Sequence, residues 1–243
     1  LRQWSTHGLL MKPPDRKHHR KLDIKVLFWL TLLTFTAGYT NALGLVFLSL
    51  PLTHYTGNIT NLAVSLINKG SFGSLRIILA IISFFIGGML SGIIFYKKHV
   101  GFSKKFGFAG ICSGIMYIAV NFLIRNVYMI IISTAFISGL QNGLLTRYKG
   151  MTTRTTHMTG YITDASVYLG RAISGDKETL TKFKFLVLNI FSFFLGTVIG
   201  VFSIDNLRLT AFIITGTLKI ITGIYYLIFI NKKDIHQVIL KNE

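Results

Sequence analysis

Residues 54–60 of this chain read HYTGNIT, and residues 157–163 read HMTGYIT. The two copies are 103 positions apart, and long apolar runs flank both of them. A polar, glycine-containing phrase that recurs inside apolar sequence indicates two equivalent half-sites. Interrupted hydrophobic segments in corresponding halves are a pointer to a transport pathway. The phrases therefore predict a duplicated membrane protein.

The repetition extends beyond the two phrases. Upstream, GYTN at 38–41 is matched by GLQN at 139–142, and downstream, SFFIG at 83–87 is matched by SFFLG at 192–196. The offset grows from 101 to 103 to 109 positions, as short loop insertions would produce. Matches in the same order predict two internal repeats. The alternative is a coincidence among abundant Phe, Gly and Ile residues.

The composition is typical of an integral membrane protein. Of 243 residues, 51% are hydrophobic and 14% are charged, which excludes an ordinary soluble domain. The net charge of +18 does not indicate nucleic-acid binding, because Lys and Arg cluster beside the apolar runs, where they orient helices and meet anionic headgroups. The predicted partners are the lipid bilayer and a small-molecule solute. Gly-x-x-x-Gly spacings also allow a homo-oligomer.

Six apolar stretches are long enough to cross a bilayer core, which takes about 20 residues. Two further segments, 56–68 and 158–172, follow the repeated phrases and are too short to span unless they are extended and tilted. We predict half-helices there. The six predicted spans are 26–50, 75–96, 106–124, 127–146, 183–203 and 209–230.

The distribution of Lys and Arg favours this arrangement. Six spans with the N-terminus inside put 21 of these residues inside and 4 outside, whereas eight spans give 17 and 8. The positive-inside rule prefers six, with both termini cytoplasmic. Three spans per repeat is an odd number, so the two repeats would be inverted relative to each other. Eight spans with parallel repeats is the alternative.

The predicted fold is therefore an all-α, polytopic helix bundle in a bacterial inner membrane, with two inverted repeats of three spanning helices and one half-helix each. The predicted units are a basic cytoplasmic arm at 1–25, a first repeat at 26–124, a second repeat at 127–230 and a cytoplasmic tail at 231–243.

The phrases predict helix starts inside the membrane. Thr56 and Thr159 are good N-cap residues, and Gly57 and Gly160 let the chain turn before each helix. A helix that starts at membrane depth presents unpaired N–H groups and a positive dipole end, which attract an anion or a carbonyl oxygen.

Polar residues along the two short segments predict a water-filled pathway between them. Asn58 and Asn61 share one face of the first segment, and Asp164 lies on the matching face of the second. The alternative is a pair of interfacial helices whose polar faces touch headgroups and water.

His54 and His157 stand at the head of the phrases. A histidine titrates near neutral pH and could carry a proton. The alternative is a capping histidine that bonds the backbone. No Cys or carboxylate cluster accompanies the pair, so we predict no metal site and no cofactor.

Four further polar residues lie in apolar spans. We predict that Asn41, Gln141 and Asn142 either contact substrate or form hydrogen bonds between helices. Lys219 lies in the middle of the last span, where a charge is costly unless it faces water or a partner. Asp164 is its predicted ion-pair partner.

These residues resemble a known family. AGYTNA at 37–42, TGN at 56–58, GLQN at 139–142 and THMTG at 156–160 are similar to the YoaK-type family of bacterial integral membrane proteins, over roughly residues 25–230. The resemblance implies a multi-spanning inner-membrane protein of unknown function. Export of small metabolites has been suggested for some members.

The resemblance includes one departure. The family commonly has an acidic residue where Asn41 stands. If relatives carry protons on that acid, the resemblance implies that proton coupling here is absent or falls to His54, His157 or Asp164.

Common enzyme signatures are absent from the sequence, and we expect no enzyme. The predicted function is transport or export of a small polar or anionic metabolite through a site formed by both His-x-Thr-Gly half-helices. A passive channel and a membrane scaffold or assembly subunit are the alternatives. The predicted substrate-binding residues are Asn41, His54, Thr56, Gly57, Asn58, Asn61, Gln141, Asn142, His157, Thr159, Gly160, Asp164 and Lys219.

Overall fold

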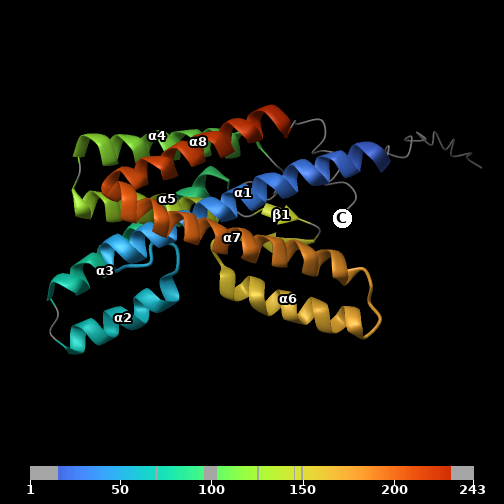
Figure 1. The fold of residues 1–243 in the computed structure, drawn as a ribbon, viewed down its shortest axis with the longest axis horizontal. Coiled ribbons are helices and arrows are strands. Elements are labelled where there is room, and N and C mark those ends of the chain that lie inside the picture. The colour runs from blue at the N-terminus through green and yellow to red at the C-terminus, as the bar shows by residue number, and fades with distance from the viewer. Residues whose placement is uncertain are drawn as a thin grey trace, which may run out of the picture.

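The protein is an elongated bundle of long helices with two short helices among them (Figure 1). Of the predicted terminal segments, residues 1–15 and 231–243 lie outside the part of the chain that the structure describes. The computed structural model describes residues 16–68, 71–95, 103–124, 126–144, 146–148 and 150–230.

Helices form where the apolar segments predict them. The predicted spans correspond to α1 (Arg16–Leu48), α3 (Ser71–Ile94), α4 (Lys104–Ala119), α5 (Val127–Gly143), α7 (Thr179–Leu207) and α8 (Ala211–Phe229). The two short segments are α2 (Tyr55–Ile67) and α6 (Met158–Ile173). A π-helical turn at Val120–Ile124 continues α4, and a 3-10 turn at Arg208–Thr210 separates α7 from α8.

One predicted boundary is wrong. The span predicted at 127–146 ends as a helix at Gly143, and an antiparallel hairpin of β1 (Thr146–Tyr148) and β2 (Met151–Thr153) follows. The glycine at position 150, with φ 76°, makes the turn between the strands in a conformation that favours glycine.

Four stretches of the described residues are long and apolar enough to cross a membrane. Large apolar side chains on these stretches, such as Phe85 and Phe202, are 69% exposed. The chain therefore has the character of a multi-pass membrane protein whose apolar outer surface suits contact with lipid. The stretches are Leu22–Leu48, Gly73–Ile94, Lys104–Ile124 and Thr179–Phe229, the last of which covers both α7 and α8, whereas α5 is apolar but shorter.

Close packing at glycines joins the helices in pairs: α1 with α7, α3 with α5, and α4 with α8. A Cβ at Gly38 would collide with the main chain of α7 at Phe193, and one at Gly139 would collide with the main chain of α3 at Phe84. Small residues let helix backbones approach closely where lipid gives no hydrophobic drive to association.

The order of contacts along each pair sets the helix directions. Contacts advance together along α1 and α7, and also along α3 and α5, so these two pairs are parallel. Contacts run in opposite order along α4 and α8, which are antiparallel. The defining contacts are Thr31 with Ser192 and Gly38 with Thr197, then Phe84 with Gly139 and Ser91 with Gly143, then Gly107 with Gly223 and Gly114 with Gly216.

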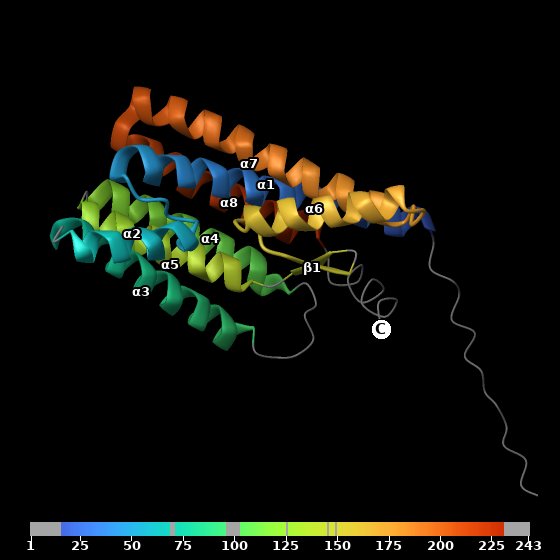
Figure 2. The same cartoon turned by 90° about the horizontal axis from the view of Figure 1, so that it is seen from below.

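The two short helices point toward opposite ends of the bundle (Figures 1 and 2). Both begin near the middle of its long axis. From there α2 runs beside α3 toward one end, and α6 runs beside α7 toward the other. The segments that lead into α2 and α6 therefore come together near the centre.

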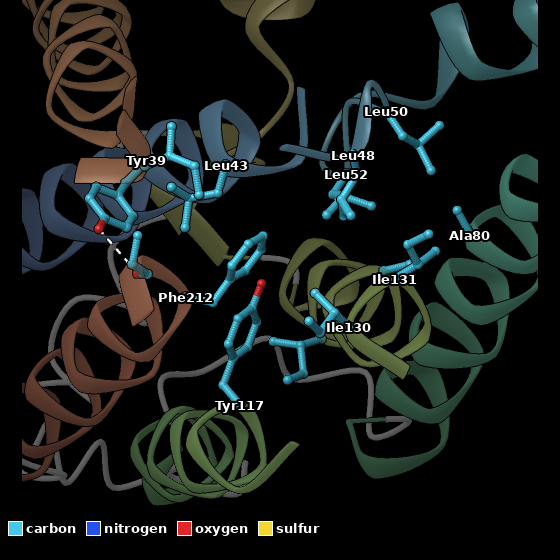
Figure 3. Packing of buried hydrophobic residues seen from close by; sticks show 14 of the residues in the cluster. Tyr39, Leu43, Leu48, Leu50, Leu52, Ala80, Tyr117, Ile130, Ile131 and Phe212 are labelled. Atoms are coloured by element: carbon cyan, nitrogen blue, oxygen red, sulfur yellow. Dashed lines mark hydrogen bonds between the residues drawn. The ribbon is translucent and has the colours of Figure 1, made fainter. Parts of the chain in front are cut away.

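Buried apolar side chains form two clusters. The first cluster includes the aromatic side chains of Trp29, Phe106 and Tyr226. The other is shown in Figure 3, where the Tyr39 hydroxyl donates a hydrogen bond of 3.1 Å to the carbonyl of Ala211. The second cluster also contains Leu48, Leu50 and Leu52, so the segment that follows α1 is packed in the interior.

Candidate functional site

The connection before α2 folds back along α1. It turns at Ser49, whose φ is 54°, and the N–H of Leu50 then donates to the carbonyl of Gly44 at 3.1 Å. At the end of the connection, the N–H and hydroxyl of Thr53 donate to Asn41 Oδ1 at 3.2 and 2.9 Å. The start of α2 is thus held level with Asn41, well inside the end of α1.

The connection before α6 ends in the same way. The Thr156 hydroxyl donates to Asn142 Oδ1 at 2.7 Å. Thr156 lies 103 positions after Thr53, and Asn142 lies 101 positions after Asn41. Each copy of the phrase is therefore preceded by a threonine that is anchored to the asparagine of the upstream motif.

Neither short helix has a side-chain cap. The N-cap residues are His54 and His157, and neither side chain accepts a hydrogen bond from the first turn. The prediction that Thr56 and Thr159 are the caps is wrong, because both already belong to the first helical turn. Among the described residues, the first N–H groups of both helices thus have no N-cap side chain as acceptor, although the Met158 N–H donates to the carbonyl of Thr156 at 3.1 Å.

A cavity of about 390 Å³ lies against the first turns of both short helices, and we call it the central cavity. Its volume falls in the range of small-molecule sites, about 300–1,000 Å³. Its walls carry hydroxyls, amides, two imidazoles and a guanidinium. The lining residues are Thr53, His54, Tyr55, Thr56, Phe84, Gly88, Gly139, Asn142, Gly143, Arg154, Thr156, His157 and Thr159.

The described lining of the central cavity carries a guanidinium and two imidazoles, which are basic groups. His54 and His157 are close enough to interact electrostatically, and the His54 ring also packs edge-on against Phe193, with centroids 5.4 Å apart. Arg154 adds a permanent positive charge. No carboxylate belongs to the described lining.

A second cavity of about 340 Å³ adjoins the first, and we call it the hairpin-side cavity. Arg154 and His157 line both cavities. The other lining residues are Thr152 of β2 and, from α6, Gly160, Tyr161 and Asp164. Arg154 therefore stands where the two cavities meet.

Lys219 does not pair with Asp164, contrary to prediction. Lys219 is 6% exposed, and its ammonium donates to Gln141 Oε1 at 2.6 Å. Gln141 Nε2 in turn donates to the Thr155 hydroxyl at 2.8 Å. The predicted pair fails because α8 presents Lys219 to α5, whereas Asp164 is exposed on α6, which runs beside α7.

The structure brings some of the predicted residues together and leaves others apart. Asn58, for example, is fully buried and donates from Nδ2 to the carbonyl of Pro51 at 2.7 Å. His54, Thr56, Asn142, His157 and Thr159 line the central cavity, and Gly160 and Asp164 line the hairpin-side cavity. Asn41, Gly57, Asn58, Asn61, Gln141 and Lys219 line neither of the two.

Sequence reasoning missed several lining residues. Thr53 and Thr156 directly precede the two histidines, so extending the repeat by one position would have found them. Arg154 has no such signal, because the residue 103 positions earlier is Pro51. Within the described ranges, no group of three or more His, Cys, Asp or Glu side chains could hold a metal ion.

Comparison with known proteins identifies a family. No curated protein and no solved structure matches the chain. A family model described as "Protein of unknown function (DUF1275)" matches residues 29–225, in agreement with the resemblance to YoaK-type membrane proteins. Since this match covers most of the sequence, the chain belongs to the DUF1275 family.

Proposed function

We propose that this protein transports a small polar or anionic solute across the bacterial inner membrane through the central cavity. One observation carries the proposal: a single cavity of about 390 Å³ is lined by the first turns of α2 and α6, which begin with the two copies of the repeated phrase. Helix ends that meet near the middle of the long axis of a membrane bundle provide polar groups where the lipid provides none.

We further propose that the two halves are inverted repeats. The antiparallel packing of α4 and α8, the last helices of the two halves, supports this. Parallel halves would make these two helices run in the same direction. The opposite courses of α2 and α6 from the centre also agree with half-helices that enter from opposite faces.

The proposed orientation puts both termini in the cytoplasm. With six crossings, 21 Lys and Arg face that side and 4 face the other. Short basic segments stay on the cytoplasmic side of bacterial membranes.

Flux into liposomes tests the proposal. The purified protein is reconstituted, and the uptake of radiolabelled succinate, inorganic phosphate, glycerol and Rb⁺ is compared with uptake by protein-free vesicles. We expect protein-dependent uptake of at least one polar probe, and uptake that saturates identifies a transporter rather than a passive channel. No protein-dependent uptake of any probe would contradict transport and favour a scaffold.

Paired threonine variants locate the path. Thr56→Val with Thr159→Val removes two hydroxyls from the cavity wall, and we expect flux to fall about tenfold or more, since each lost hydrogen bond is worth about 1 kcal/mol. The matched control is Thr60→Val with Thr163→Val, one turn along the same helices, where the hydroxyls bond the carbonyls of Thr56 and Thr159. Equal flux in the two double variants would contradict this path.

A further inference from the structure

We propose that the central cavity selects a small oxyanion, a solute with a carboxylate or phosphate group, and that Arg154 is the residue that selects it. This inference rests on the proposed function and names the class of substrate. Four observations support it: the charge of the lining, the uncapped helix ends, the position of Arg154, and the charge of Lys219, whose partner among the described residues is a neutral amide.

The charge of the lining favours an anion. The described lining combines Arg154, His54 and His157 with neutral hydroxyl and amide groups, and it contains no carboxylate. A cavity walled by low-dielectric protein and carrying one sign of charge concentrates ions of the other sign. A cation would meet the guanidinium without a counter-charge on the same wall.

The uncapped helix ends add directed hydrogen-bond donors. The first turns of α2 and α6 both line the central cavity, and neither N-cap histidine accepts a hydrogen bond from them. In α6 the Met158 N–H donates to the carbonyl of Thr156 at 3.1 Å, so the donors that remain there belong to the residues after Met158. Such N–H groups and the dipoles behind them favour an oxyanion. Here the two helix ends act on one cavity that already holds a guanidinium.

Arg154 lines both cavities, so it lies beside a solute that moves from one to the other. Its carbonyl accepts the N–H of His157 at 3.0 Å, which fixes the turn that carries it. Among the described residues no carboxylate forms an ion pair with it, so its guanidinium is available to a solute. A guanidinium binds a carboxylate or phosphate with two parallel hydrogen bonds, which gives selectivity.

Lys219 adds a positive charge close to the central cavity, although it does not line the cavity itself. Its ammonium is connected through Gln141 to Thr155, which directly precedes the lining residue Thr156. Among the described residues its hydrogen-bond partner is the neutral amide of Gln141. A buried ammonium without a counter-ion is costly at membrane depth, and a bound anion nearby would offset part of that cost.

Asp164 is the one described carboxylate on the walls of the two cavities, and it lies on the hairpin side beyond Arg154. For an anion that follows this route, Asp164 is a local barrier. Its removal should therefore help passage, whereas removal of Arg154 should prevent it. A cation would show the opposite pattern.

The test combines flux with binding. Uptake of radiolabelled succinate, inorganic phosphate, glycerol and Rb⁺ is measured for the wild-type protein, Arg154→Gln and Asp164→Asn. We expect protein-dependent uptake of succinate or phosphate, a loss of about tenfold or more in Arg154→Gln, and equal or faster uptake in Asp164→Asn. Arg154→Lys should restore part of the rate, because it keeps the charge and loses the planar fork. Comparison of the succinate and phosphate arms distinguishes the two oxyanion chemistries.

The control and the second readout separate this inference from the proposed function. Arg171→Gln changes an exposed arginine of α6 that lines neither cavity, and the uptake by this variant should match that of the wild type.

Thermal stabilisation of the detergent-solubilised protein by succinate or phosphate measures binding without transport. Stabilisation that is lost in Arg154→Gln, in a protein without flux, would support the anion site and end the transport proposal. Uptake of glycerol or Rb⁺ alone, unaffected by Arg154→Gln, would support transport and overturn the anion site. The absence of both anion uptake and anion stabilisation would also overturn the anion site.

Discussion

The regions around α2 and α6 share a framework and differ in charge. In both, a threonine before the N-cap histidine bonds an upstream asparagine, Thr53 to Asn41 and Thr156 to Asn142. The connections that lead there differ, because a short return along α1 precedes α2 and a β-hairpin precedes α6. The shared bonds place two helix starts at one cavity, while the permanent charge of the described lining comes from Arg154, on the α6 side.

A second difference between the two regions lies in the residues that hold the cavity lining in place. The connection before α6 is tied to α8 through Gln141 and Lys219. The residue 101 positions before Gln141 is Thr40, whose hydroxyl bonds the carbonyl of Thr36 within its own helix. The α6 side is therefore stabilised by a charged network, whereas the α2 side is stabilised by local hydrogen bonds and apolar packing.

The largest expected effect comes from breaking that charged network. Gln141→Leu leaves the Lys219 ammonium buried without an acceptor and removes a partner of Thr155. We expect the free energy of unfolding to fall by about 3–5 kcal/mol, measured by denaturant titration in mixed micelles. Thr40→Val, the control from the first half, should cost no more than about 1 kcal/mol.

The double variant Gln141→Leu with Lys219→Met sharpens this result. Removing the charge as well as its partner replaces a polar pair by apolar side chains, which is often close to neutral in stability. We therefore expect the double variant to recover most of the loss. A double variant as unstable as Gln141→Leu alone would show that the ammonium is not the cause.

The threonine–asparagine bonds shared by the two regions predict similar, intermediate losses of stability and flux when either asparagine is removed. Asn41→Ala and Asn142→Ala each leave a threonine hydroxyl without its acceptor. We expect each to lower the free energy of unfolding by about 1–3 kcal/mol and to lower flux, because a helix start is no longer anchored. A large effect on one side with none on the other would break the equivalence of the two regions.

The smallest expected effect separates the two glycines of the phrases. A Cβ at Gly57 would meet open space, whereas a Cβ at Gly160 would collide with the His157 ring. Gly57→Ala should be neutral or stabilising by up to about 1 kcal/mol, as expected for Gly to Ala within a helix. Gly160→Ala should displace His157 from the cavity wall and change the flux rate. Identical flux in the two variants would contradict the position of His157.

The sequence predicted most of the helices and the convergence of the two phrases, because apolar length and a polar repeat are properties of local sequence. It did not predict the hairpin after Gly143, since each of its strands is only three residues long and too short to show an alternating pattern. It named the wrong partner for Lys219, because which face of α8 meets α5 depends on packing at glycines far apart in the chain. Arg154 was missed because its neighbours in space, rather than its spacing, make it part of a cavity wall.

The central claim is that α2 and α6 leave one central cavity toward opposite faces of the membrane. Single cysteines at the far ends of the two helices, Asn68→Cys and Ser174→Cys in a Cys112→Ser background, test it with a membrane-impermeant maleimide applied to intact cells and to inverted vesicles. If the two half-helices enter from opposite faces, Asn68→Cys is labelled from the outside and Ser174→Cys from the cytoplasmic side. Labelling of both from the same side would contradict it.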